Sequence, residues 1–98
     1  MRLKIIAILL LMFSLPVSAV SFNCRYARKA AEVAICQSSY LSNLDDQLSS
    51  AYYSLPRYVR KKVRRSQRRW LRNRNRCGSN RRCIGRAYRS RINQLSNY

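Results

Sequence analysis

The stretch from Arg57 to Arg91 carries the side chains whose type and spacing most clearly suggest a chemistry, and that chemistry is anion binding. It holds 16 of the chain's 21 lysines and arginines and no acid. The acids of the whole chain are Glu32, Asp45 and Asp46, and it has no histidine, so the formal net charge of +18 cannot be neutralised internally. We therefore expect an anionic partner.

Catalytic chemistry is not favoured by the remaining residue types. The chain lacks histidine for acid–base work, and its sequence shows neither a metal-ligand spacing nor a glycine-rich phosphate loop. A glycosidase pair built from Asp45 with Asp46 or Glu32 is conceivable, but adjacent residues on a helix do not face each other. We expect a binding protein without a cofactor or a bound metal, and not an enzyme.

Residues 1–19 have the pattern of a secretory signal peptide, which leaves residues 20–98 as one small domain. The apolar run is too short for a membrane span, although an uncleaved anchor is the alternative. No small residue directly precedes Cys24, which argues against lipidation. We expect a periplasmic or secreted protein. The three parts of the signal are the basic residues Arg2 and Lys4, an apolar run over residues 5–13, and a small-residue cleavage site at residues 17–19.

The four cysteines, all in the predicted mature domain, indicate two disulfides in an exported chain. A zinc site would need closer spacing or histidines. Four cysteines allow three pairings, and the spacing favours the local ones, Cys24 with Cys36 and Cys77 with Cys83. The crossed pairings close longer loops and gain slightly more entropy in the unfolded state, so energetics alone leaves them open.

Helical periodicity predicts an all-α domain, formed by an antiparallel helical hairpin with short flanking helices and stapled by the two disulfides. The hairpin helices are expected at about residues 38–54 and 56–76, with a short helix from about Arg28 and a last one from about Arg81. Gly78 is expected to end the second hairpin helix. The side chains expected to face inward are Leu41, Leu44, Leu48, Tyr52, Leu55, Val59, Val63, Ser66, Trp70, Ile84, Ala87, Tyr88, Ile92 and Leu95.

The second hairpin helix should carry a wide cationic face. Basic residues four apart, such as Arg64 and Arg68, cost about 0.2 to 0.5 kcal/mol per pair in an exposed helix, and a merely solvated face would interleave acids. The alternative is that arginine only keeps the protein soluble. As the alternative to a protein partner, we expect this face to bind lipopolysaccharide, acidic glycan, anionic lipid or, outside the cytoplasm, nucleic acid. The expected anion-binding residues are Arg57, Arg60, Lys61, Arg64, Arg65, Arg68, Arg69 and Arg72.

Two further motifs are a Q-x-x-W-L-x-x-R-x-x-C run from Gln67 to Cys77 and an E-x-x-I-C run that ends at Cys36. With them, nearly the whole predicted mature chain resembles the LprI-type lysozyme inhibitor domain. The resemblance implies a small exported bacterial domain with two disulfides that binds a cell-wall-acting protein and inhibits lysozyme.

We expect the residues of these motifs to be structural. Trp70 shares an apolar stripe with Val63, so core packing is favoured over stacking on a sugar or an aromatic partner. Asp45 is expected to pair across the hairpin with an arginine such as Arg74 or Arg91. The predicted structural residues are Glu32, Asp45, Gln67, Trp70, Leu71 and Arg74.

Overall fold

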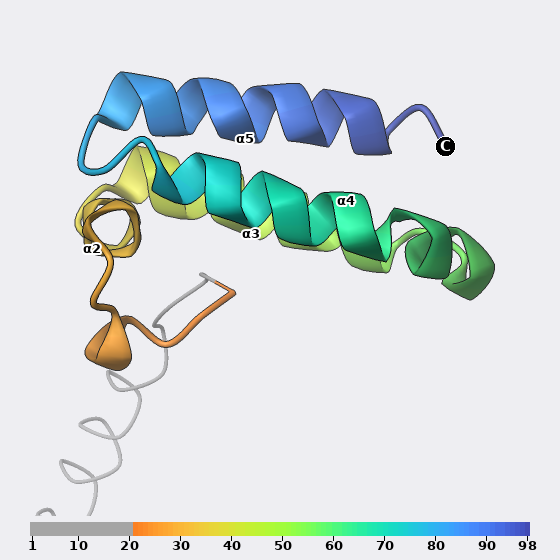
Figure 1. Cartoon of the computed structure of the whole chain (residues 1–98), viewed down its shortest axis with the longest axis horizontal. Helices are drawn as coiled ribbons and strands as arrows, with labels where there is room; N and C mark the ends of the chain where they lie inside the picture. Colours follow the sequence, from red (N-terminus) through yellow and green to blue (C-terminus); the bar gives the residue numbers. More distant parts are fainter. Residues whose placement is uncertain (1–20) are drawn as a thin grey trace, which may run out of the picture.

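The computed structural model describes residues 21–98, so the predicted signal peptide lies outside the described residues. This part of the chain forms helices and contains no strand, which confirms the predicted all-α class (Figure 1). Each predicted helix is present within a few residues of its expected bounds. The elements are a 3₁₀ turn η1 (Cys24–Tyr26) and the helices α2 (Ala30–Cys36), α3 (Ser39–Tyr53), α4 (Arg57–Asn75) and α5 (Arg81–Leu95).

Capping side chains and backbone constraints set the helix ends. The Ser38 hydroxyl accepts a hydrogen bond from the backbone N–H of Leu41 at the start of α3, and the Asn80 side chain accepts one from Cys83 at the start of α5. Pro56, which has no backbone N–H, directly precedes α4. Gly78 has a φ of 59° in the turn before α5, a left-handed conformation that glycine adopts without a steric penalty.

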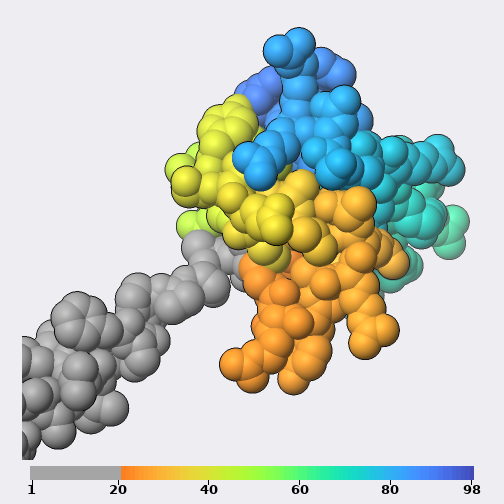
Figure 2. Space-filling view, turned by 90° about the vertical axis from the view of Figure 1, so that its left-hand side faces the viewer, coloured from red at the N-terminus to blue at the C-terminus, as the bar shows by residue number. Residues whose placement is uncertain are grey.

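Helix α5 packs against both α3 and α4 and so joins the two long helices (Figure 1). The short helix α2 covers one end of the bundle, where it contacts α3, α4 and α5 (Figure 2). Gly85 of α5 packs against α3, since a Cβ atom at this position would lie 3.5 Å from the Tyr40 ring. The buried apolar residues are Ala31, Ala34, Ile35, Leu41, Leu44, Leu48, Leu55, Val63, Ile84, Tyr88 and Leu95.

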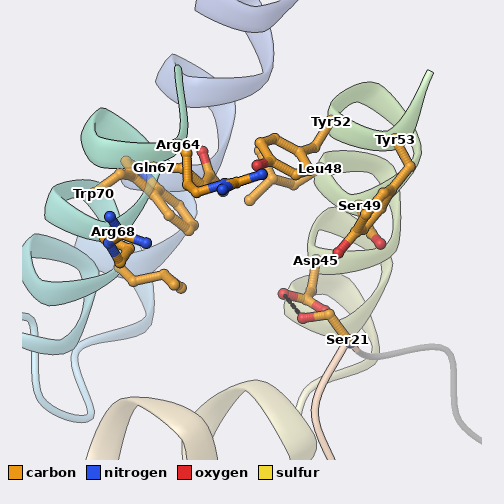
Figure 3. A pocket seen from close by; sticks show the side chains of 11 residues that line it. Ser21, Asp45, Leu48, Ser49, Tyr52, Tyr53, Arg64, Gln67, Arg68 and Trp70 are labelled. Atoms are coloured by element: carbon orange, nitrogen blue, oxygen red, sulfur yellow. Dashed lines mark hydrogen bonds between the residues drawn. The ribbon is translucent and has the colours of Figure 1, made fainter. Parts of the chain in front are cut away.

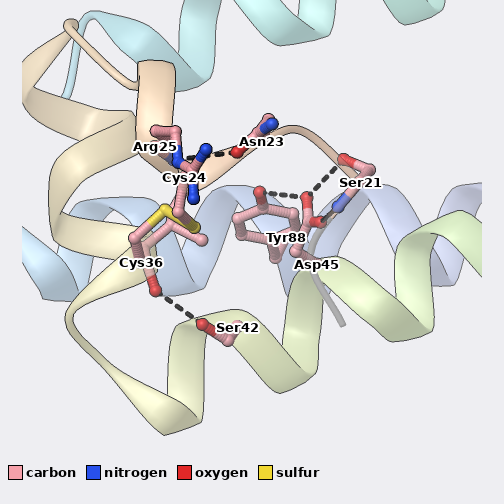
Figure 4. Close-up of a disulfide and its surroundings, with 9 residues drawn as sticks. Ser21, Asn23, Cys24, Arg25, Cys36, Ser42, Asp45 and Tyr88 are labelled. Carbon is pink, nitrogen blue, oxygen red and sulfur yellow. Dashed lines mark hydrogen bonds between the residues drawn. A yellow bond between two sulfur atoms is a disulfide. The ribbon is translucent and has the colours of Figure 1, made fainter. Parts of the chain in front are cut away.

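The two disulfides are the local ones, Cys24–Cys36 and Cys77–Cys83, as predicted. The first ties η1 to the last residue of α2, next to the hydrogen bond that the Ser42 hydroxyl donates to the Ile35 carbonyl at 2.7 Å (Figure 4). The second ties the turn after α4 to the first turn of α5. Each staple therefore fixes one junction of the bundle.

Removal of the first staple should lower the thermal stability of the domain. Replacing Cys24 and Cys36 together with serine opens a loop with a sequence separation of 12 residues. The chain-entropy relation gives a loss of about 3 kcal/mol, which lowers the melting temperature of a domain this small by roughly 10 to 20 °C. Thermal unfolding followed by circular dichroism measures the change. A melting temperature equal to that of the parent would contradict a stabilising role.

Candidate functional site

The outer surface of α4 forms a face of basic side chains. Of the eight predicted anion-binding residues, Arg60 is half-buried and the other seven are exposed, and Lys62 is exposed beside them. The chain's three acids all precede α4. Residues three or four positions apart lie on the same side of a helix, so the face divides into two rows. The groove row, on the side of α3, is Arg57, Lys61, Arg64 and Arg68, and the outer row is Lys62, Arg65, Arg69 and Arg72.

A groove with a cavity volume of about 290 Å³ lies between α3 and α4 (Figure 3). Its apolar lining is formed by Leu48 of α3 and by Trp70 and Leu71 of α4. Arg64 extends from α4 toward Tyr52 on the opposite wall (Figure 3). The groove therefore combines apolar surface with guanidinium groups.

The groove continues into a second hollow next to the connection between α3 and α4. Tyr52, Tyr53 and Arg64 line both hollows, and Arg57, Arg60 and Lys61 complete the second one. One N–H of the Arg60 guanidinium donates to the Tyr53 carbonyl at 3.0 Å, and the group lies 5.6 Å from the centre of the Tyr53 ring. Because arginine has five N–H donors, this contact fixes the guanidinium and leaves other donors for a ligand.

The opposite end of the groove is closed by the carboxylate of Asp45, whose side chain is only 2% exposed. Ser21 donates to it from both its backbone N–H and its hydroxyl, and the Tyr88 hydroxyl donates at 2.7 Å (Figure 4). The same hydroxyl accepts a hydrogen bond from Arg74 at 3.0 Å. The sequence prediction that Asp45 pairs directly with Arg74 or Arg91 is therefore wrong, because Tyr88 stands between the two charges.

Arg74 is buried among aromatic rings at the inner side of α4. Its guanidinium lies 5.7 Å from the ring centres of Phe22 and Trp70 and 5.9 Å from that of Tyr88. Its Nε and Nη2 donate to the side chain of Asn75, and its Nη1 to Tyr88. A buried charge needs such partners, and here the side chains of Tyr88 and Asn75 supply them.

Arg91 of α5 is the second buried arginine, and its hydrogen bonds show what the Gln67 side chain contacts. Its Nε donates to the Gln67 side chain at 2.8 Å, and its other nitrogens donate to Ser66 and Gln94. Burial lowers the pKa of Arg91 below its ordinary value. The bonds to Ser66 and Gln67 connect α5 to α4.

Three other predicted structural residues have different positions. Trp70 is half-buried, and its indole N–H donates to the Ala87 carbonyl at 3.0 Å, but its ring also lines the groove. Leu71 is 38% exposed and lies at the groove instead of in the core. Glu32 is half-buried in the first turn of α2.

Among residues 21–98 there is no group of three or more side chains able to hold a metal ion, and both cysteine pairs are oxidised. Within the same range, none of the helices has the length and apolarity required to cross a bilayer. Asp45 is saturated by donors and buried, so it is poorly placed to accept a proton from a substrate.

Comparison of the chain with protein-family models, curated proteins and solved structures finds no match. The resemblance to the LprI-type domain therefore stays a prediction. Function has to be argued from the groove, which the sequence analysis missed, and from the cationic face beside it. The only sequence signal of the groove was an apolar residue, Leu71, next to Trp70 on a helix rich in arginine.

Replacing Asp45 with alanine should destabilise the domain by about 2 to 4 kcal/mol, because it leaves the buried Tyr88 hydroxyl without its acceptor and removes the negative charge at the other end of the link to Arg74. Chemical denaturation measures the loss. The neighbouring Asp46 is exposed, so its replacement with alanine is the matched control, with an expected change within about 0.5 kcal/mol. Equal effects of the two substitutions would contradict the importance of the buried cluster.

Stability should fall at alkaline pH through Tyr88. Burial raises the pKa of Tyr88 far above its ordinary value, and the Asp45 carboxylate adds to this while Arg74 opposes it. The folded state therefore holds the neutral phenol. Its contribution is complete below the unfolded pKa of about 10 and decreases as pH rises above it. Denaturation at about pH 9 and pH 11 should show a smaller loss for Tyr88→Phe than for the parent. Tyr26→Phe, at an exposed tyrosine, should keep the parent's loss.

Proposed function

We propose that this protein is a non-catalytic, exported binder of anionic polymers or surfaces in the bacterial cell envelope. The observation that carries the proposal is the cationic face of α4. Two adjacent rows of exposed basic side chains run along a helix of 19 residues that carries no acid. Such a face attracts polyanions and binds them with a strong dependence on salt.

The geometry of α4 also favours a binding role for the basic face over the alternative that its arginines only keep the protein soluble. The buried residues Val63 and Arg74 lie on one side of the helix, and the basic rows lie on the others. The basic side chains of the two rows therefore repel one another without contributing to the packing of the core. Contact with an anionic partner removes this cost, which gives the face a physical reason to bind.

Binding to a cell-wall-acting protein such as lysozyme is the activity that the family resemblance implies. No arrangement of the described residues favours it, because the motif residues Asp45, Gln67 and Arg74 are used in internal contacts. A turbidity assay of lysozyme activity at micromolar protein tests this activity separately.

The proposal predicts tight retention on immobilised heparin and lipopolysaccharide. Affinity should decrease about tenfold or more between 50 and 200 mM salt, because several ion contacts are replaced by salt ions. Reversal of Arg64, Arg65, Arg68 and Arg69 to glutamate should abolish retention at the higher of these salt concentrations.

The matched control reverses four exposed basic residues outside α4, namely Arg25, Arg28, Arg82 and Arg86, with the same change of net charge. This control should retain most of the binding. Equal loss in both variants would show that only net charge matters and would contradict a binding face on α4. Retention that ignores salt would contradict the proposal altogether.

A further inference from the structure

We propose that the groove between α3 and α4 is a binding site for a single anionic lipid, with its phosphate at the connection between the two helices and its acyl chain along the apolar lining. This inference deepens the proposed function and rests on it, because the cationic end of the groove belongs to the basic face of α4. It adds a ligand class that a polyanion-binding surface does not require.

The phosphate end is defined by the hollow at Arg57, Arg60 and Lys61. Arg60 is half-buried and already held by the Tyr53 carbonyl, so little side-chain entropy is lost when it binds an oxyanion. Arg64 lines both hollows and can reach the same group. Guanidinium groups match phosphate geometry and form charge-assisted hydrogen bonds with it.

The part of the groove that would hold the acyl chain is defined by Leu48, Trp70 and Leu71. Leu71 is 38% exposed there, although it lies on a helix whose other exposed positions are mostly basic. The cavity volume of about 290 Å³ is close to the lower limit of small-molecule sites, which suits part of one acyl chain. A purely polymeric anion has no group that would use this surface.

The charge distribution along the groove sets the orientation of the ligand. Asp45 closes the end that is remote from the hollow at Arg57, and its oxygens are occupied by Ser21 and Tyr88. The hollow is lined by Arg57, Arg60, Lys61 and Arg64, whereas the rest of the groove has Arg68 and the Asp45 carboxylate. A negative headgroup is therefore favoured at the hollow. The acyl chain therefore extends from the phosphate toward Trp70, with its end directed to Ser21.

Trp70, the only tryptophan of the chain, provides a direct probe because it lines the groove. Titration of the protein with lysophosphatidic acid below its micellar concentration should shift the emission of Trp70 to shorter wavelength in a saturable manner. Glycerol 3-phosphate has the headgroup without the chain, and lysophosphatidylcholine has the chain with a zwitterionic headgroup. Each should bind at least about tenfold more weakly than lysophosphatidic acid.

Two pairs of variants with equal charge change locate the site. Arg60→Gln with Arg64→Gln removes two guanidinium groups from the groove, and Arg65→Gln with Arg69→Gln removes two from the outer row. We expect about a tenfold loss of lysophosphatidic acid affinity for the groove pair and less than about threefold for the outer pair. A third pair of variants tests the apolar part of the groove. Leu71→Asn should weaken lipid binding, while Tyr58→Asn, at an exposed residue away from the groove, should not.

Several results would overturn the inference: equal loss in the two arginine pairs, equal binding of glycerol 3-phosphate, equal binding of lysophosphatidylcholine, or an emission shift with anionic vesicles but none with monomeric lipid. Retention on heparin distinguishes a failure of the lipid-site inference from a failure of the proposed function. If Leu71→Asn retains heparin as the parent does but no variant affects lipid binding, the groove site is wrong and the cationic face stands. If the parent does not retain heparin, the proposed function fails.

Discussion

The hydrogen-bonded chain from Asp45 through Tyr88 to Arg74 determines how the three long helices are arranged. It takes one residue from each of α3, α5 and α4 and places them in the bundle interior. The negative and positive ends are separated by a neutral phenol, which serves as donor to one and acceptor to the other. Because a buried charge without a partner is costly, each of these three residues depends on the other two. The groove exists because α5, with this chain, holds α3 and α4 while the opposite side between them stays open.

The arginines of this protein belong to two physical classes, although they are contiguous in sequence. Arg74 and Arg91 are buried, and amide, hydroxyl and aromatic groups surround them instead of a directly paired acid. The arginines of the two rows on α4 are exposed and contribute nothing to the core. Neutral acceptors thus provide the hydrogen bonds of the two buried arginines in a protein with few acids. The exposed basic side chains on α4 are left available to a partner.

Much of the fold could be predicted from the sequence, because helix bounds and local disulfides depend on short-range signals such as Ser38, Pro56 and Gly78. Periodicity also identified the face of α4 that carries Val63. The sequence did not reveal which residues meet across helices, since periodicity says that a side chain points inward but not what it contacts. The role of Tyr88 as a link, the position of Leu71 and the groove itself all depend on the distance between α3 and α4. That distance is a tertiary property, which depends on how α5 packs against both helices and on the buried link from Asp45 through Tyr88 to Arg74.

The disulfide pattern has a consequence for the order of folding. Both bridges close short loops, with sequence separations of 12 and 6 residues, whereas the helix contacts that build the core join distant parts of the chain. A chain synthesised from its N-terminus presents Cys24 and Cys36 to each other well before Cys77 exists. Each disulfide can therefore form between cysteines that are close in sequence, before the helices dock and with little opportunity for mispairing. The groove, by contrast, needs α5, which brings Tyr88 to Asp45 across a sequence separation of 43 residues.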